Sequence, residues 1–185
     1  MTIEQKSASF EFMAFIEDEG TRVFLEKFSS QVKAENCRGK VINIVSFVDY
    51  LLSELLIKFS PNKLKATKLT SDLSGCLNSI MNKANVCHML ALLTDNEFEH
   101  IKLLANVRND FAHDWLTDFT SSQVVKRIGK LSSNSNLSSE AKFMVIGGEL
   151  VTLLHHRLGY AEILNEDLPN KNMVNTASKM APKRI

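Results

Sequence analysis

The segment 108–113, Arg-Asn-Asp-Phe-Ala-His, brings together three side chains that could act on a phosphodiester. Asn109 and His113 are four residues apart, so on a helix they share one face, and Arg108 lies on the adjoining face. Histidine exchanges protons near neutral pH, and arginine stabilises the negative charge of a phosphorane. As catalytic residues, Arg108, Asn109 and His113 could therefore support cleavage of RNA by its own 2'-hydroxyl group without a metal ion.

A structural interpretation of His113 competes with the catalytic one. A positively charged histidine in the last turn of a helix is stabilised by the helix dipole, and such residues are common. Spacing alone favours this structural role over catalysis.

The helix that carries these residues has the best-defined start in the chain. Residues 94–97, Thr-Asp-Asn-Glu, have the form of a capping box, and Leu93 and Phe98 occupy the two positions of a hydrophobic staple. We predict a helix over 95–115. Its predicted core stripe, in steps of three and four, is formed by Phe98, Ile101, Ala105, Arg108, Ala112 and Trp115.

An arginine in a core stripe needs a partner, because burial of an unpaired charge costs several kcal/mol. The nearest candidates by residue type are Asp49 and Glu54, the only charged residues in the apolar run 41–57. Arg108 would then clamp a carboxylate across two helices. If it instead faces a groove, its two-pronged donor set would accept a phosphate. The stripe favours the first alternative, a structural ion pair of Arg108 with Asp49 or Glu54.

The remaining sequence also has a helical pattern. Only seven glycines and three prolines punctuate the chain, and apolar residues recur at intervals of three and four. This pattern predicts an all-α fold, a multi-helix bundle with the apolar run in its central helix. Residues 1–164 are expected to form a single helical domain and residues 165–185 a mobile polar tail. We place the other helices at 9–18, 21–33, 38–59, 71–93, 120–131, where Thr120 and Gln123 offer a capping box, and 140–158.

Two adjacent glycines, Gly147 and Gly148, leave two alternatives for the last segment. A continuous helix fits the apolar stripe, and the glycines would let a neighbouring helix approach closely. A hairpin that turns at the glycines is the second alternative, because two glycines inside a helix cost about 2 kcal/mol relative to alanine. The length of the stripe favours the helix.

The charge balance disfavours specific DNA binding. The chain has 22 Lys and Arg against 21 Asp and Glu, without the basic excess of a protein that neutralises a DNA backbone. A small basic patch is predicted in a loop at 58–68, which has no acidic residue. No series of aromatic residues alternates with its lysines to stack on bases, so we interpret the patch as a solvated loop. The patch consists of Lys58, Lys63, Lys65 and Lys68.

Cysteine usage predicts a reducing, cytoplasmic location, because Cys37, Cys76 and Cys87 form neither an even set nor a Cys-x-x-Cys pair. Cys87-His88 has no second ligand pair at zinc spacing, so we expect no metal site. No phosphate-binding glycine loop or nucleotide fingerprint is present, so no cofactor is expected. The apolar run 41–57 is short of a membrane span and carries two acids, so we expect no membrane association.

The Arg-Asn-x-Phe-Ala-His core at 108–113, with the amphipathic segment 77–93 before it and Phe119 and a capped short helix after it, resembles the mannitol operon repressor (MltR-type) family. The apolar run 41–59 with its embedded Asp49 fits that family's long helix, and the resemblance covers about residues 41–130. The resemblance implies an all-helical bundle and a regulatory role in sugar-alcohol uptake.

The Arg-x4-His signature is also similar to that of HEPN domains, many of which are ribonucleases or RNA-binding proteins in toxin and defence systems. Under this resemblance, His113 is the acid/base, Arg108 the phosphate clamp and Asn109 the orienting residue. HEPN-like proteins commonly pair through the helix end that here carries Trp115 and Leu116, so we expect a homodimer. Burial of these apolar residues within one chain is the alternative.

We therefore predict a cytoplasmic MltR-like regulator that acts through contacts with a protein partner. No helix-turn-helix with a basic recognition helix is visible, which argues against operator binding. A HEPN-type, metal-independent ribonuclease or RNA-binding protein is the alternative, with RNA as the partner. A metabolite-binding module is a third class that no sequence motif supports.

Overall fold

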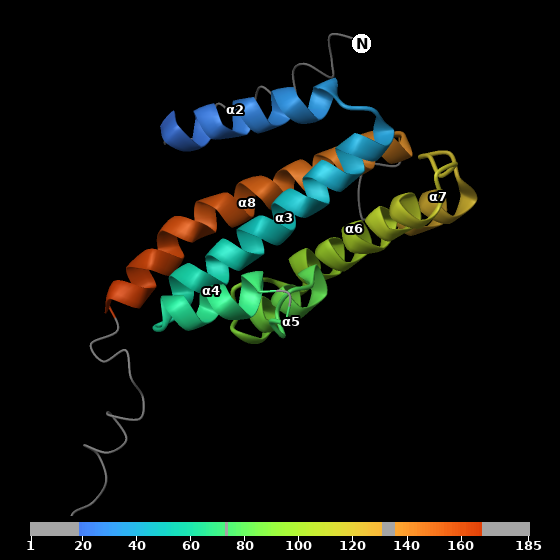
Figure 1. The fold of residues 1–185 in the computed structure, drawn as a ribbon. Coiled ribbons are helices and arrows are strands. Elements are labelled where there is room, and N and C mark those ends of the chain that lie inside the picture. The colour runs from blue at the N-terminus through green and yellow to red at the C-terminus, as the bar shows by residue number, and fades with distance from the viewer. Residues whose placement is uncertain (1–18, 73, 131–135, 168–185) are drawn as a thin grey trace, which may run out of the picture.

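The computed structural model describes residues 19–72, 74–130 and 136–167, which contain seven helices and no strand (Figure 1). The predicted all-α fold is confirmed for this part of the chain. The predicted helix at 9–18, and the part of the predicted tail after Asp167, lie outside the described residues. The helices are α2 (Glu19–Ala34), α3 (Cys37–Phe59), α4 (Lys63–Ser71), α5 (Ile80–Met89), α6 (Asp95–His113), α7 (Ser122–Ile128) and α8 (Ser139–Asp167).

Helix α3 is at the centre of the fold, as its apolar sequence predicts. It runs alongside α8, with α2 on one side and α6 on another (Figure 1), and it also contacts α4 and α5. A helix that is apolar almost all round can bury residues against several neighbours at once. Its buried side chains are Val41, Ile44, Val45, Val48, Leu51, Leu52, Leu55 and Leu56.

Helix α8 is continuous through Gly147 and Gly148, so the helical alternative is correct and the hairpin is wrong. Gly147 is buried against Ile44 of α3. The absent side chain at Gly147 lets α8 lie close to the central helix. The helix continues to Asp167, well beyond the predicted end near Leu158.

Two predictions between α3 and α6 are wrong. The segment 58–68 is not a loop, because Asn62 caps a new helix by accepting a hydrogen bond from the Lys65 N–H at 3.0 Å. The predicted helix at 71–93 is reduced to α5, which Ser79 caps through the Asn82 N–H. The chain turns at Gly75, whose N–H donates to the Asp72 carbonyl at 2.8 Å, and a Cβ at this position would not fit against the Leu69 carbonyl.

The predicted capping box at the start of α6 is confirmed. Thr94 Oγ1 accepts from the Glu97 N–H at 3.3 Å, and Glu97 Oε2 accepts from the Thr94 N–H at 2.8 Å. The predicted box of Thr120 and Gln123 is wrong. Helix α7 begins at Ser122 without a side-chain cap, because Thr120 donates to Asp118 and Gln123 donates to Asp110.

In the described part of the chain, none of the helices combines the length and the apolar composition needed to cross a membrane.

Candidate functional site

Helix α6 is rotated relative to the predicted stripe, and Arg108 is exposed. Ile101 and Ala105 are buried as predicted, but Ala112 and Trp115 are exposed. The core takes the larger side chains of the neighbouring positions, because they remove more apolar surface from water than Ala112 would. These side chains are Leu104, Val107 and Phe111. The prediction that Arg108 lies in or beside the core is therefore wrong.

Lys83 of α5, not Arg108, is the partner of Asp49. Its ammonium lies 2.9 and 2.8 Å from the two carboxylate oxygens, and its side chain is only 4% exposed. Arg108 instead donates to the side-chain oxygen of Asn109 at 3.1 Å. Among the described residues, Arg108 forms no ion pair with Asp49 or with Glu54, which lies half-buried on α3. The predicted structural ion pair is therefore not formed.

The sequence contained a signal for Lys83. Its helical neighbours at minus three and plus four are Ile80 and Cys87, which place Lys83 on the inner side of α5. A lysine in that position needs a buried carboxylate as much as an arginine does.

The three candidate catalytic residues, Arg108, Asn109 and His113, are not equally close to one another. Arg108 and Asn109 are joined by the hydrogen bond given above. His113 is the last residue of α6 and is also exposed. It lies about 7.5 Å beyond Arg108 and about 6 Å beyond Asn109 along the helix axis, from the rise per residue. The structure therefore brings Arg108 and Asn109 together and leaves His113 more than one turn away.

Asp110, the variable residue of the motif, attaches α6 to α7. Its carboxylate accepts from Arg127 Nε at 2.6 Å and from the Gln123 amide at 2.6 Å, and its side chain is only 13% exposed. Sequence reasoning missed this anchor. A carboxylate in the last turn of a helix faces the negative end of the helix dipole, which is a signal that a cationic partner is needed.

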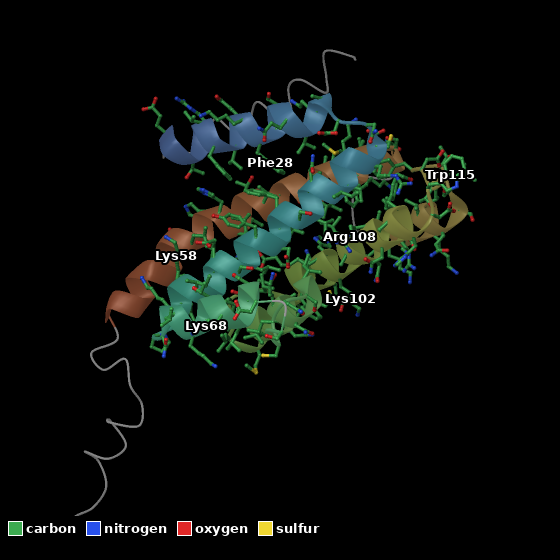
Figure 2. The ribbon with its side chains drawn as sticks, in the orientation of Figure 1. Phe28, Lys58, Lys68, Lys102, Arg108 and Trp115 are labelled. Atoms are coloured by element: carbon green, nitrogen blue, oxygen red, sulfur yellow. The ribbon has the colours of Figure 1, made fainter. Side chains whose placement is uncertain are left out.

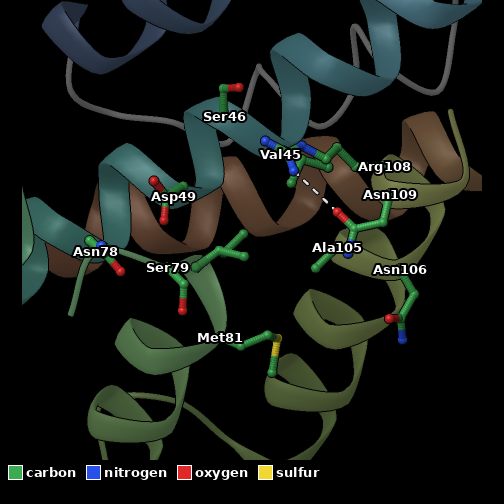
Figure 3. Close-up of a pocket in the computed structure, with 11 residues that line it drawn as sticks. Val45, Ser46, Asp49, Asn78, Ser79, Met81, Ala105, Asn106, Arg108 and Asn109 are labelled. Atoms are coloured by element: carbon green, nitrogen blue, oxygen red, sulfur yellow. Dashed lines mark hydrogen bonds between the residues drawn. The ribbon is translucent and has the colours of Figure 1, made fainter. Parts of the chain in front are cut away.

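A cavity of about 440 Å³ lies between α3, the first turn of α5 and α6 (Figure 3). Arg108 and Asn109 line its α6 wall, and Asp49 lines its α3 wall. Ser46 and Asn106 add a hydroxyl and an amide. The cavity lining does not include His113. Sequence analysis did not predict this cavity, because residues of three helices form it.

The chain beyond α6 exposes two large apolar side chains. Trp115 is 82% exposed and Leu116 is 67% exposed. The turn that carries them is held by Arg38, which donates to the Asp114 carbonyl at 2.9 Å, and by Asp114, whose carboxylate accepts from the Leu116 N–H at 2.9 Å. Figure 2 shows Trp115 at the end of the molecule where α6 approaches α7. We call Trp115 and Leu116 the apolar tip.

The predicted basic patch lies at the opposite end of the molecule from the apolar tip, as the positions of Lys58, Lys68 and Trp115 in Figure 2 show. Lys63, Lys65 and Lys68 are exposed on α4, and Lys58 is half-buried near the end of α3. The lysines therefore belong to a helical surface that is separate from the segment 108–113.

Cys87 and His88 do not come together with further metal ligands. Cys87 is buried, and burial raises the pKa of its thiol to about 12. The His88 ring stacks on Phe98 and its Nε2 lies 2.7 Å from Asp95. Among the described residues, no group of three or more His, Cys, Asp and Glu side chains could hold a metal ion.

Comparisons of the chain with protein-family models, with curated proteins and with solved structures give no match.

Proposed function

We propose that this chain is a cytoplasmic regulatory protein with an MltR-like bundle, and that it acts as a homodimer which binds another protein. The apolar tip carries this proposal. Trp115 and Leu116 are 82% and 67% exposed, and they follow directly after the Arg-Asn-x-Phe-Ala-His core on which the resemblance rests. Exposed tryptophan is favourable at the centre of a protein interface, where a partner removes its ring from water.

The apolar tip is held in place before a partner arrives. Arg38 ties its turn to α3, and the Asp110–Arg127 ion pair ties the end of α6 to α7. A preorganised surface loses less conformational entropy when it binds. Two copies that meet at their tips would cover both tryptophans, which supports the homodimer.

The net charge of +1 supports contact with protein rather than with DNA. If the MltR resemblance extends to function, the regulated process is the uptake of a sugar alcohol. In that case the protein would affect transcription through its protein partner.

Light scattering at micromolar concentration tests the homodimer. We expect the mass of a dimer for the wild type and of a monomer for Trp115→Ser. Met89→Ser is the matched control, because Met89 is also exposed, at the end of α5. It should remain a dimer. A monomeric wild type would contradict the homodimer.

Capture of partners from a lysate of the source organism tests the regulatory role. We expect the wild type to retain a transcriptional or transport protein, identified by mass spectrometry, that Trp115→Ser does not retain. Retention of RNA alone would contradict regulation through protein contacts.

A second candidate is a HEPN-type ribonuclease, and the exposure of Arg108, Asn109 and His113 favours it. Neither Arg108 nor His113 forms an ion pair with a described residue, and with the exposed Asn109 they could reach an RNA strand. Arg108 would bind the scissile phosphate, oriented by Asn109, while His113 moves a proton between the attacking 2'-hydroxyl and the leaving 5'-oxygen. A dimer formed at the tips would bring the two sets of residues toward each other.

Incubation with single-stranded RNA in EDTA tests this second candidate. Cleavage should leave cyclic phosphate ends, DNA should be inert, and His113→Ala should lower the rate by about 10² to 10⁴. His100→Ala is the matched control, because His100 lies on α6 but outside the motif. Cleavage of DNA, or cleavage that EDTA abolishes, would contradict this mechanism.

A further inference from the structure

We propose that the cavity between α3, α5 and α6 binds a small organic phosphate whose remaining part carries hydroxyl groups. The cavity has a volume of about 440 Å³, within the range of small-molecule sites. Figure 3 shows Arg108 and Asn109 on one side of it and Asp49 and Ser79 on the other sides. Charge and hydrogen-bonding capacity decide which ligand it fits.

Arg108 is the group that would bind the phosphate. One of its terminal nitrogens donates to Asn109, and its guanidinium forms no other hydrogen bond to a described residue. The remaining N–H donors are arranged in a planar fork that matches two phosphate oxygens. The Asn109 bond orients the guanidinium on the cavity wall.

The carboxylate in the cavity does not compete for Arg108. Both oxygens of Asp49 are bound by the buried ammonium of Lys83, at 2.9 and 2.8 Å. Lys83 thus balances the charge of Asp49, and Arg108 supplies the remaining positive charge of the site. The first turn of α5 also lines the cavity, and the positive end of its helix dipole adds to the preference for an anion.

The uncharged side chains of the lining suit a hydroxylated ligand. Ser46 and Asn106 line the cavity, and neither side chain has a hydrogen-bond partner in the described part of the chain. The Asn109 amide nitrogen is likewise unused by the described residues. Amides and hydroxyls both donate and accept, as the hydroxyl groups of a ligand do.

A nucleotide fits this cavity less well. Its lining contains no aromatic side chain on which a base could stack. The proposed site is also independent of the proposed regulatory surface, because neither Trp115 nor Leu116 lines it.

Isothermal titration calorimetry of the full chain with glucose 6-phosphate tests the proposal. Glucose 6-phosphate should bind. Inorganic phosphate, which lacks the part that carries hydroxyl groups, and AMP, whose base meets no aromatic side chain in the lining, should bind more weakly. Glucose should bind at least about tenfold more weakly, because it lacks the phosphate and a charged hydrogen bond is worth about 1.5 to 3 kcal/mol. Arg108→Gln should weaken binding of glucose 6-phosphate at least about tenfold for the same reason. Arg22→Gln is the matched control, because Arg22 lies on α2 outside the cavity, and it should bind as the wild type does.

A second variant blocks the cavity without changing its charge. Ser46 is exposed on α3, so Ser46→Leu should fold normally, as far-ultraviolet circular dichroism can verify, and should also weaken binding of glucose 6-phosphate. The proposal is overturned if glucose 6-phosphate does not bind the wild type, or if neither Arg108→Gln nor Ser46→Leu weakens its binding. It is also overturned if AMP or a single-stranded RNA oligonucleotide binds more tightly than glucose 6-phosphate.

Discussion

Gly147 of α8 lies so close to Ile44 of α3 that a Cβ atom at Gly147 would come within 2.6 Å of Ile44 Cγ2. Helices α3 and α8 therefore approach each other closely at a residue without a side chain. Gly147→Ala forces Ile44 or the helices to shift, and overpacking of this kind costs about 1 to 3 kcal/mol. Urea denaturation should show that loss in the free energy of unfolding.

The neighbouring residue provides the control. A Cβ at Gly148 would meet no atom within 4 Å, so Gly148→Ala should stabilise the protein by about 0.5 to 1 kcal/mol through helix propensity. Equal effects of the two substitutions would contradict the close approach of α3 and α8.

The Asp49–Lys83 ion pair should matter more for stability than Arg108 does. Asp49→Ala leaves the buried Lys83 ammonium without its partner and should cost about 3 kcal/mol, at the low end for such pairs because the Asp49 side chain is 33% exposed. Arg108→Ala should change the free energy of unfolding by less than about 0.5 kcal/mol, as an exposed residue does. Adding Lys83→Met to Asp49→Ala should recover part of the loss. If Arg108→Ala lowered the free energy of unfolding more than Asp49→Ala does, Arg108 would be the structural cation.

Acid should weaken the contact between α6 and α8. Burial alone would raise the pKa of Glu97, but hydrogen bonds from Arg157 and Thr94 outweigh it and hold the pKa below the ordinary value of 4.5. The ionised carboxylate therefore stabilises the folded protein fully above about pH 4.5, and this contribution is lost as the pH falls through the lower pKa of the folded state.

Glu97→Gln measures that contribution. The variant should lose about 1.5 to 3 kcal/mol at neutral pH, the value of hydrogen bonds to a charged group, and its stability should fall less steeply on acidification than that of the wild type. Denaturant unfolding between about pH 5.5 and about pH 3 covers the titration of the group. Glu99→Gln is the control, since Glu99 is an exposed residue of the same helix. If the stability of Glu97→Gln falls as steeply on acidification as that of the wild type, the pH dependence comes from other carboxylates.

The Asp110–Arg127 pair should determine how firmly α7 is attached. Arg127→Met removes two donors from Asp110 and should cost about 1.5 kcal/mol, with faster amide exchange in α7. Lys126→Met is the control, because Lys126 is exposed beside it. If the amides of α7 exchange at the same rate in both variants, the Asp110–Arg127 pair does not hold α7.

Contacts within one turn of a helix join residues that are close in the sequence, so the sequence by itself determined the features that depend on such contacts. Helix α6 begins at Asp95, as the capping box of Thr94 and Glu97 predicts. The apolar run at 41–57 predicted the central helix α3, and the stripe around Gly147 predicted a continuous α8. Each of these features depends on residues no more than four positions apart.

The tertiary structure alone decided the rotation of α6 and the partner of Asp49. The predicted and the observed stripe share Ile101 and Ala105. Packing against α3 and α8 buried the stripe with Phe111 and left Arg108 exposed. Lys83 reached Asp49 across 34 residues of sequence because α5 packs on α3. Rotation about a helix axis changes no contact within that helix, so only the side chains of the neighbouring helices can choose which face is buried.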